Sequence, residues 1–507
     1  MHYLISGLTH GFRVGVSDPP SSPHVSKNLR SALNEPEIAT QLIEKEVTKG
    51  FMLGPFKKPP LPAFRASPVG IATRKYSGKK RLIIDLSAPH SGPIPSINSL
   101  IPREPYSLFY ATVDHAMLLI KQAGRGAQLS KADISDAFKV MPLHPSQWPM
   151  FGIKWQSQFY FSVKLTFGGR SSPAIFNVLA EALCWALLNY MRVPAVLHYL
   201  DDFLLIDPPG IPSVSLDKLR GLFQRVGVPI SEEKTLGPLT SLEFLGITLD
   251  SERMQASLPL EKLARISKVS HEFSTTAQVS KREALSLLGH LTFAMKIIPQ
   301  GRSFVSRLLT ATHAVPGLLD SVTLDEGCRS DLRFWGQLLA HWNGISFFYE
   351  DVISSADDLK FFTDAAPSLG FGGMFQNRWF AGSWPREFAD LDQSSALYEM
   401  YPIVVACHLW GHFWARKRIA VKCDNSAVVA IVNKGRSACP DIMPFVRRLT
   451  WLSVTLNFII VAQHLPGHSN TVADHLSRFN FQAFRRLCPE ADPEPTPIPD
   501  FAALTLS

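Results

Sequence analysis

Two adjacent aspartates constrain this chain more than any other feature of its sequence. Asp201 and Asp202 stand between two strand-like apolar runs, residues 195–200 and 203–206. Neighbouring carboxylates in apolar surroundings are costly unless a cation or a tight exposed turn accommodates them. Asp133 lies in a similar position near the end of the strand-like stretch 129–134. We therefore expect these carboxylates to lie at strand ends, where they can hold metal ions.

The length and charge of the chain favour a multidomain protein that binds a polyanion. A chain of 507 residues with 46% apolar content can bury several cores, and typical domain sizes predict roughly three or four units. The formal net charge of +8 and the pI near 9.1 favour a polyanionic partner, because such a surface attracts phosphate. The net charge therefore indicates what the protein associates with, and it does not indicate the fold.

The cysteines and the hydropathy pattern predict an intracellular protein without a membrane anchor. Six cysteines are scattered and form no Cys-x-x-Cys pair, so we expect reduced, mostly buried thiols. No apolar run approaches the roughly 18 residues of a membrane span, and the N-terminus lacks the basic-then-apolar layout of a signal peptide.

The chain divides into five predicted segments of different composition and periodicity. The predicted segments are 1–35, a loop-rich extension rich in Ser, Pro and Gly; 36–258, where strands and helices alternate; 259–355, mostly helical; 356–480, a further α/β unit; and 481–507, a Pro-rich, acidic, disordered tail.

Several elements of the second segment can be predicted individually. Residues 35–49 show helical spacing of apolar positions, and residues 173–188 form a long helical stretch. Strand-like runs at 69–73 and 82–86 flank a hairpin tip crowded by basic residues. Further strands are expected around 128–134 and 196–206.

The predicted helical segment is basic. Between Glu261 and Leu309 there are eight Lys or Arg residues against three Glu. Such a surface suits a helical element that lies along a nucleic-acid backbone, and it also suits an ordinary solvated helix face.

Four further acids occur at suggestive places in the predicted α/β unit. Asp364 and Asp424 each end a strand-like run, Glu399 opens a helical pattern, and Asp474 lies in the stretch 472–478. Each acid alone is commonly a surface or helix-capping carboxylate. Clustered, the four would form a second metal site.

The order and content of six blocks resemble the reverse transcriptase family. The blocks are 69–71 with 81–87, resembling the fingers hairpin; 133–138 with 142–144, the first catalytic block; 165–169 with 172–176, the template-contact block; 199–203, the central catalytic turn; Lys234, the following block; and 242–246, the primer grip.

This resemblance implies a right-hand polymerase of fingers, palm and thumb, within a multidomain α+β and α/β protein. Asp133, Asp201 and Asp202 would bind two Mg²⁺ ions, with Mn²⁺ as a substitute, so that the attacking and leaving oxygens of nucleotidyl transfer are neutralised. Phe138 would exclude a 2′-hydroxyl and select deoxynucleotides, or is only a core aromatic residue. Lys234 would protonate the leaving pyrophosphate, or is a surface lysine.

The resemblance also implies contacts with the other substrates. Arg81, with Arg74 or Lys75, would clamp the incoming triphosphate, because guanidinium and ammonium groups match phosphate. Phe167 stands where retroviral members carry a Gln, which bears on template contact and leaves catalysis intact.

The last α/β unit resembles the ribonuclease H family. Asp364, Glu399, Asp424 and Asp474 match its Asp-Glu-Asp-Asp set, which would hold two further Mg²⁺ ions. The stretch 464–468 with Asn470 resembles the family's final loop. His468 would be the mobile histidine that aids product release, or is an ordinary loop residue.

Residues 289–294 and 298–302, followed by Phe304 and Leu308, most resemble the connecting region of DIRS-class retrotransposons, which use a tyrosine recombinase. The resemblances together imply an RNA-directed DNA polymerase with ribonuclease H activity. Its partners would be an RNA template, a DNA primer, dNTPs, the RNA–DNA hybrid, and element-encoded RNA-binding and recombinase proteins. It would act in a cytoplasmic ribonucleoprotein or the nucleus. A pararetroviral polymerase and a non-enzymatic RNA-binding descendant stay open as alternatives.

Overall fold

The computed structural model describes residues 2–16, 20–73, 78–342, 345–347, 352–391, 394–465 and 469–506. The chain forms two compact units, Met1–Leu242 and Glu243–Ser507. The boundary between them falls before the predicted division at residue 258. The short strands that follow Leu242 therefore belong with the C-terminal unit.

The first 35 residues are more ordered than their composition predicts. Helix α1 (His2–His10) and helix α2 (Arg30–Leu33) form, and strand β1 (His24–Val25) pairs in parallel with β3 (Arg65–Ser67). Phe12 is buried, and its backbone nitrogen donates to the carbonyl oxygen of Pro142 at 2.8 Å. The prediction of a loop-rich extension is wrong for these elements, because a few apolar side chains join the core despite the abundance of Ser, Pro and Gly.

A five-stranded sheet and a separate hairpin follow in the N-terminal unit. The sheet has the order β1-β3-β7-β8-β2, in which β2 is Met52–Phe56, β7 is Gly152–Trp155 and β8 is Gln158–Ser162. Strands β4 (Val69–Thr73) and β5 (Lys80–Ile84) form the predicted antiparallel hairpin. The predicted helix at 35–49 is confirmed as α3 (Pro36–Thr48), which begins at a proline whose fixed backbone suits a first helical turn.

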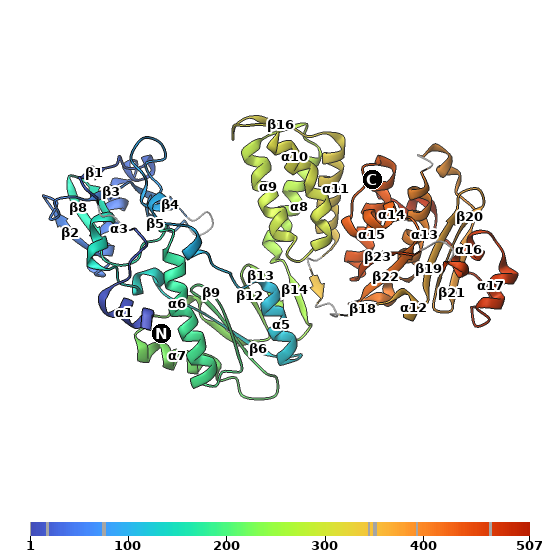
Figure 1. Ribbon diagram of the computed structural model, residues 1–507, viewed down its shortest axis with the longest axis horizontal. Coiled ribbons are helices and arrows are strands. Elements are labelled where there is room, and N and C mark those ends of the chain that lie inside the picture. Colours follow the sequence, from blue (N-terminus) through green and yellow to red (C-terminus); the bar gives the residue numbers. More distant parts are fainter. Residues whose placement is uncertain are drawn as a thin grey trace. The chain divides into compact units, whose positions relative to one another are not determined.

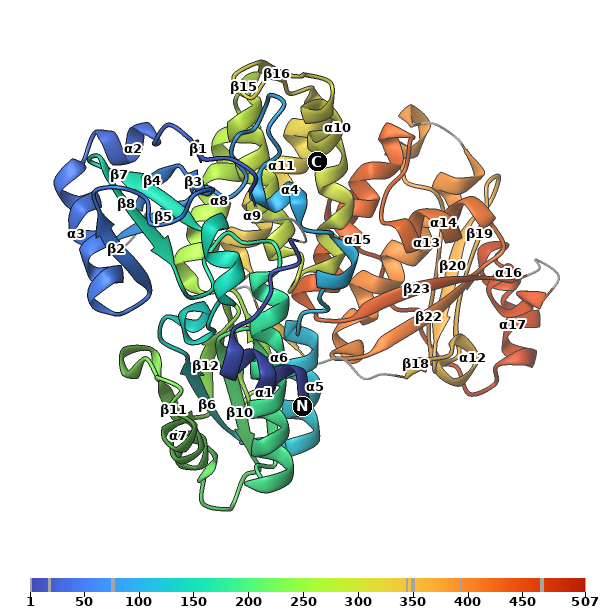
Figure 2. The same cartoon turned by 60° about the vertical axis from the view of Figure 1, so that its left-hand side comes forward.

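A second sheet carries the acidic motif. Its order is β11-β6-β10-β9, with β11 at Leu236–Leu239, β6 at Gln128–Asp133, β10 at Asp202–Asp207 and β9 at Ala195–Tyr199. Helices α5 (Val113–Ala123), α6 (Ser172–Trp185) and α7 (Ser215–Val226) pack on it (Figures 1 and 2). Phe176, Phe203 and Phe223 are fully buried in the core between these layers.

Helix α6 is also long and apolar enough to cross a membrane by length and composition. With the π-helical turn Ala186–Tyr190 that continues it, the helix spans 19 residues, and an 18-residue window within it has a mean hydropathy of 1.3 and is 44% buried inside the protein. The expectation that no apolar stretch approaches such a length overlooked this helix. Its buried face packs against β9 and the aromatic residue Phe138, as expected of a core helix.

Strand β12 (Ser241–Phe244) crosses the boundary between the two units. In the C-terminal unit it is followed by β13 (Ile247–Asp250) and β14 (Gln255–Ser257), after which the chain becomes helical as predicted. Its main helices are α8 (Leu260–Ser274), α9 (Lys281–Ala294), α10 (Ser306–His313) and α11 (Glu326–His341). We call residues 259–342 the helical segment (Figure 1). Helices α8 and α11 pack along each other. The Ser280 and Glu283 side chains form a capping box at the start of α9.

The rest of the C-terminal unit is a mixed sheet covered by helices on both faces, as Figure 1 shows. We call residues 352–506 the α/β domain. Its strands have the order β18-β22-β19-β20-β21, with β23 beside β22. The strands are β18 (Ile353–Ser354), β19 (Phe361–Ala366), β20 (Gly370–Phe375), β21 (Arg378–Gly382), β22 (Arg418–Cys423) and β23 (Ile459–His464); the main helices are α13 (Ser395–Trp410), α14 (Ser426–Lys434), α15 (Met443–Thr455) and α16 (Thr471–Ser477).

The prediction of a disordered tail is wrong for residues 481–506. Helix α17 (Phe481–Leu487) forms, and the Arg485 guanidinium donates to three main-chain oxygens of the residues that follow. Farther on, Phe501 packs against Tyr401 and Phe445, and Leu504 is fully buried. The tail is therefore part of the α/β domain, because its few apolar residues find partners that its acidic, Pro-rich composition does not reveal.

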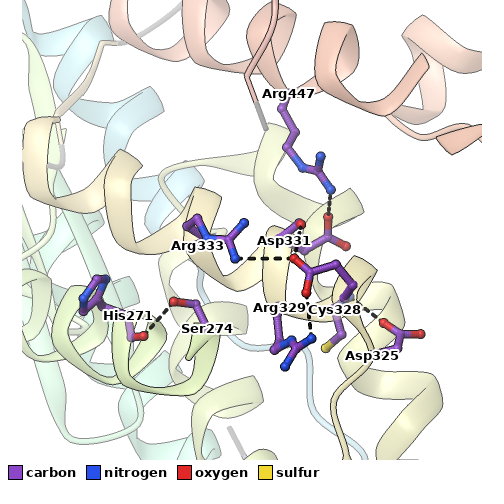
Figure 3. Close-up of polar contacts among 10 residues, drawn as sticks. His271, Ser274, Asp325, Cys328, Arg329, Asp331, Arg333 and Arg447 are labelled. Carbon is purple, nitrogen blue, oxygen red and sulfur yellow. Dashed lines mark hydrogen bonds and ion pairs between the residues drawn. The ribbon is translucent and has the colours of Figure 1, made fainter. Parts of the chain in front are cut away.

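A buried ion pair fixes the helical segment to the α/β domain. The Nη2 atom of Arg447 on α15 donates to Oδ1 of Asp331 on α11 at 2.9 Å, and both side chains are about 5% exposed or less (Figure 3). Arg307 approaches the other carboxylate oxygen at 3.8 Å. Nearby, the Ser303 hydroxyl donates to the carbonyl oxygen of Lys434. Within the C-terminal unit these two parts are therefore joined by specific polar contacts.

Loss of this ion pair should destabilise the C-terminal unit. Asp331→Ala leaves the Arg447 guanidinium buried without its carboxylate, which typically costs about 3–5 kcal/mol. The expected result is a lower free energy of unfolding in denaturant, measured by circular dichroism. The matched control is Glu326→Ala on the same helix, because Glu326 is largely exposed. Equal stability of Asp331→Ala and Glu326→Ala would contradict the assigned role.

Candidate active sites

The paired aspartates lie in a tight turn between two antiparallel strands. Strands β9 and β10 pair so that Tyr199 faces Asp202, and Leu200 adopts a left-handed backbone with φ of 53°. Such a conformation is uncommon for a residue with a side chain and marks a strained turn. The turn therefore presents both carboxylates at the end of the hairpin, as the flanking apolar runs predict.

The third carboxylate is brought beside the turn by strand register. Strands β10 and β6 pair in antiparallel fashion with Asp202 directly opposite Asp133. The backbone nitrogen of the next residue, Ile134, donates to the carbonyl oxygen of Asp201 at 3.1 Å. The sheet thus brings together the three predicted metal ligands, which lie 68 residues apart along the chain.

Two lysines partly neutralise this cluster. Lys234 Nζ donates to Asp133 Oδ1 at 2.7 Å, and Lys131 Nζ lies 3.4 Å from Asp202 Oδ1. Burial, and next the neighbouring carboxylates, raise the pKa of Asp201. Burial also raises the pKa of Asp202, although Lys131 opposes the shift. The site is therefore short of positive charge, which a bound cation would supply.

The sequence analysis named Lys234 but missed Lys131. Side chains two residues apart on a strand point to the same face, so the spacing of Lys131 and Asp133 on β6 was the available signal. Lys131 and Lys234 approach the acidic cluster from a strand and from the short helix Glu232–Lys234 respectively.

The residues predicted to contact the substrates differ in how much of their surface is exposed. Phe138 is 8% exposed and packs against Phe176 and Phe167, with ring centroids 5.5 and 4.9 Å apart, whereas Phe167 is 53% exposed. Arg81 is exposed on β5. Arg74 and Lys75 lie outside the described residues. Phe138 is thus both a core aromatic residue and a wall beside the exposed ring of Phe167.

The second acidic cluster combines two parallel strands with two helices. Strands β19 and β22 are parallel neighbours, so Asp364 near the end of one and Asp424 directly after the other share an edge of the sheet. Helices α13 and α16 pack on β19 and carry Glu399 and Asp474. The four acids predicted from the sequence are therefore assembled at one place.

Burial and mutual repulsion perturb this cluster strongly. Burial, and next the negative charges of Asp364 and Asp424, raise the pKa of Glu399 to about 9. Burial also raises the pKa of Asp364 to about 6, although the Ser477 hydroxyl, which donates to Asp364 Oδ2 at 2.6 Å, opposes the shift. Without a cation the cluster therefore retains protons near neutral pH.

Several contacts around this cluster were not predicted. Besides Ser477, the Arg478 guanidinium donates to Asp474 Oδ1 at 2.7 Å, and Asn470 Nδ2 donates to the carbonyl oxygen of Thr363. Ligand atoms of Glu399, Cys423 and Asp424 lie within 4.8 Å of one another. The only signal for Cys423 was its position before Asp424. His468, the predicted mobile histidine, lies outside the described residues.

A family of known proteins matches the part of the chain that contains the first acidic cluster. Residues 68–249 match the family model described as reverse transcriptase (RNA-dependent DNA polymerase). This part of the chain is a reverse transcriptase domain. The domain contains Asp133, Asp201 and Asp202 and ends before the helical segment, so the match does not extend to the second acidic cluster.

Retroviral and hepadnaviral proteins are similar to the chain. The Pro-Pol polyprotein of Simian foamy virus type 1 is 25% identical over 253 residues, 50% of this chain and 20% of that protein. Protein P of Duck hepatitis B virus (strain China) is 26% identical over 165 residues, 32% of this chain and 21% of that protein. The chain therefore spans about a fifth of the length of these relatives.

A solved structure shows the same kind of fold. The foamy viral protease-reverse transcriptase in complex with RNA/DNA hybrid matches 89% of this chain and 56% of its own chain, with a TM-score of 0.51 and 15% sequence identity. Because the two sequences are only 15% identical, this likeness supports a shared polymerase fold alone.

The perturbed carboxylates predict an unusual pH dependence of stability without metal. A carboxyl group whose pKa is raised on folding stabilises the fold fully below its ordinary pKa, and this contribution is lost as the pH rises through the folded pKa. The metal-free α/β domain should therefore lose stability between about pH 4 and pH 9. Glu399→Gln should stabilise it by about 1–3 kcal/mol at pH 8 and leave it unchanged at pH 4.

Denaturant unfolding of the full chain in EDTA at the two pH values measures this effect. Glu494→Gln, which alters an exposed carboxylate of the same domain, is the control and should behave as the parent at both. Equal stability of Glu399→Gln and the parent at pH 8 would show that Glu399 carries no raised pKa.

Proposed function

We propose that the chain is an RNA-directed DNA polymerase that also degrades the RNA strand of the RNA–DNA hybrid. The observation that carries the polymerase half is the pairing of Asp133 with Asp202 across β6 and β10, with Asp201 in the adjoining turn. A module that only bound nucleic acid would gain nothing from crowding acids where it meets phosphate. The reverse transcriptase domain around this cluster supports the same conclusion.

The proposed parts of the polymerase follow the two units. The five-stranded sheet with the β4–β5 hairpin corresponds to the fingers, and the sheet β11-β6-β10-β9 to the palm. The helical segment corresponds to the thumb and connection, and the α/β domain to ribonuclease H. The basic surface of the helical segment, with its excess of Lys and Arg between residues 261 and 309, suits contact with a phosphate backbone.

The donor sets of both clusters fit divalent cations. Carboxylate oxygens are the ligands that Mg²⁺ prefers, with Mn²⁺ as a substitute. The raised pKa values of Asp201, Asp202, Asp364 and Glu399 indicate negative charge that the protein itself does not compensate. Two bound ions at each site would neutralise charge on the attacking and leaving oxygens.

The chain's own residues orient the polymerase substrates. Phe138 is a buried aromatic residue, and its ring would leave no room for a 2′-hydroxyl and so select dNTPs. Lys234 Nζ lies 2.7 Å from Asp133 Oδ1, and its ammonium group would donate a proton to the departing pyrophosphate. Arg81, with Arg74 or Lys75, binds the triphosphate, and the exposed ring of Phe167 contacts the template.

In the proposed nuclease, two metal ions would be held by four carboxylates, those of Asp364, Glu399, Asp424 and Asp474, and would supply the charge stabilisation that cleavage of the RNA strand needs. Ser477 and Arg478 position two of these carboxylates through hydrogen bonds. His468 aids product release. The RNA template and DNA primer are thus the substrates of the first site, and the hybrid is the substrate of the second.

The connecting blocks at residues 289–302 support assignment to a DIRS-class retrotransposon. Element-encoded RNA-binding and recombinase proteins would then be partners, and the site of action would be a cytoplasmic ribonucleoprotein or the nucleus. The similarity to Protein P of Duck hepatitis B virus favours a pararetroviral polymerase as the second candidate. A recombinase reading frame beside this one would decide for the retrotransposon.

Asp201→Ala tests the polymerase. Removal of this carboxylate should reduce extension of a DNA primer on an RNA template at least about 1,000-fold, on the order of the loss when a group that stabilises transition-state charge is removed. The protein should remain folded because one of three clustered negative charges is removed. Asp217→Asn on α7, an exposed carboxylate of the same unit, is the control. Extension at the parent rate by Asp201→Ala would refute the polymerase assignment.

Asp424→Asn tests the nuclease independently. This variant should extend primers as the parent does and lose cleavage of the RNA strand in a hybrid by about 100-fold or more. Cleavage of a 5′-labelled RNA annealed to DNA measures the effect. Asp390→Asn, at an exposed position of the α/β domain, should cleave normally. Unchanged cleavage by Asp424→Asn would leave only the polymerase assignment standing.

A further inference from the structure

One large apolar side chain close to the catalytic turn is fully exposed. Phe109 has a relative exposure of 104%, and the adjacent Tyr110 is 42% exposed. Both lie in residues 107–112, which form neither helix nor strand. Burying a phenyl ring is worth roughly 1.5–3 kcal/mol, so a ring held wholly in solvent is a feature that folding alone does not favour.

The chain is held in place before and after the loop that carries Phe109. Before the loop and the short helix Glu104–Tyr106 that precedes it, Arg170 Nη1 donates to the carbonyl oxygen of Ile101 at 2.7 Å, and Asn98 Nδ2 donates to that of Gly168 at 2.9 Å. At its end, the Thr112 and His115 side chains form the capping box of α5. The loop therefore leads from the block proposed to contact the template to the helix beside the catalytic sheet.

A ring contact joins this loop to the catalytic turn. The centroids of Tyr110 and Tyr199 lie 5.0 Å apart, with an angle of 31° between the rings. Tyr199 precedes the turn that holds Asp201 and pairs with Asp202. Phe109 is thus one residue from a side chain that packs directly on the catalytic turn.

We propose that Phe109 is a stacking platform for a nucleobase of the primer–template at the polymerase site. The proposal rests on the proposed function, because that function places nucleic acid beside Asp133, Asp201 and Asp202. Every nucleobase offers a flat π-face, and stacking on an aromatic side chain is tolerant of sequence. Tyr110 packs against Tyr199 and thereby positions the ring of the preceding residue, Phe109.

A nucleobase fits the ring better than a partner protein does. Protein interfaces need a contiguous surface of about 800 Å² on each side, whereas residues 107–112 expose one fully accessible ring. A single exposed ring matches a single base.

The binding constant of the full chain for a primed template tests the proposal. The probe is a labelled DNA primer annealed to an RNA template with an overhang, and fluorescence anisotropy gives Kd without nucleotides. Phe109→Ala should raise Kd at least about fivefold, the lower end of the range for base stacking. Phe109→Trp should bind within about twofold of the parent, because the larger ring still stacks.

A matched control separates stacking from a general loss of aromatic surface. Tyr190, 72% exposed at the far end of the α6 segment, is the comparison, and Tyr190→Ala should leave Kd unchanged. The slope of log Kd against log salt should be equal for Phe109→Ala and the parent, because loss of a stacked ring releases no counterions. A reduced slope would point to an electrostatic role and overturn the proposal.

Abasic substitutions in the probe locate the base. If Phe109 stacks on one base, one abasic position should weaken binding by the parent and have no further effect on Phe109→Ala. The absence of such a position, or an unchanged Kd for Phe109→Ala, would overturn the proposal. So would a lower melting temperature of Phe109→Ala, which would show that another part of the protein covers the ring. Primer extension by the parent chain, measured in parallel, reports separately on the proposed polymerase function.

Discussion

The need to place like charges side by side governs the polymerase site. Asp133 and Asp202 face each other across paired strands, and Asp201 lies in the adjoining turn. Sheet formation forces this contact, because the register that buries the apolar residues of β6 and β10 also aligns the two acids. Lys234 and Lys131 offset part of the repulsion. The remaining negative charge makes the site a binding place for cations, and the proposed chemistry follows from that.

The α/β domain also places acidic side chains side by side, but it limits their repulsion in a different way. Its acids come from parallel strands and from helices, and no lysine within the described residues approaches Asp364 or Glu399 as Lys234 approaches Asp133. Burial and repulsion therefore raise the pKa of Glu399 to about 9. The two sites thus represent two states of an acidic cluster without metal, one partly neutralised by two lysines and the other by retained protons and by Arg478.

Local patterns in the sequence were enough to predict the elements that carry the acids. The apolar runs around Asp201 and the helical pattern that Glu399 opens correspond to β9, β10 and α13, because these elements bury faces with a simple period. Contacts made between distant segments could not be predicted in this way. Arg447 and Asp331 are 116 residues apart, and no periodicity indicates that they meet.

Composition was the least reliable guide. The Pro-rich tail and the Ser- and Pro-rich start both pack onto the protein through a few apolar side chains, among them Phe501 and Phe12. Average composition does not show where a single aromatic side chain becomes buried against the rest of the protein. Phe109 illustrates the reverse case: its sequence neighbourhood gives no sign that the ring stays in solvent.

The central claim is that Asp133, Asp201 and Asp202 form a cation site, and anomalous scattering from Mn²⁺ tests it most directly. Crystals of the full chain with a primed template and an incoming nucleotide would be grown with Mn²⁺. The account predicts two anomalous peaks among these carboxylates, about 3.5–4 Å apart, with Lys234 displaced from Asp133. Peaks confined to other parts of the protein, with the Lys234–Asp133 hydrogen bond intact, would contradict it.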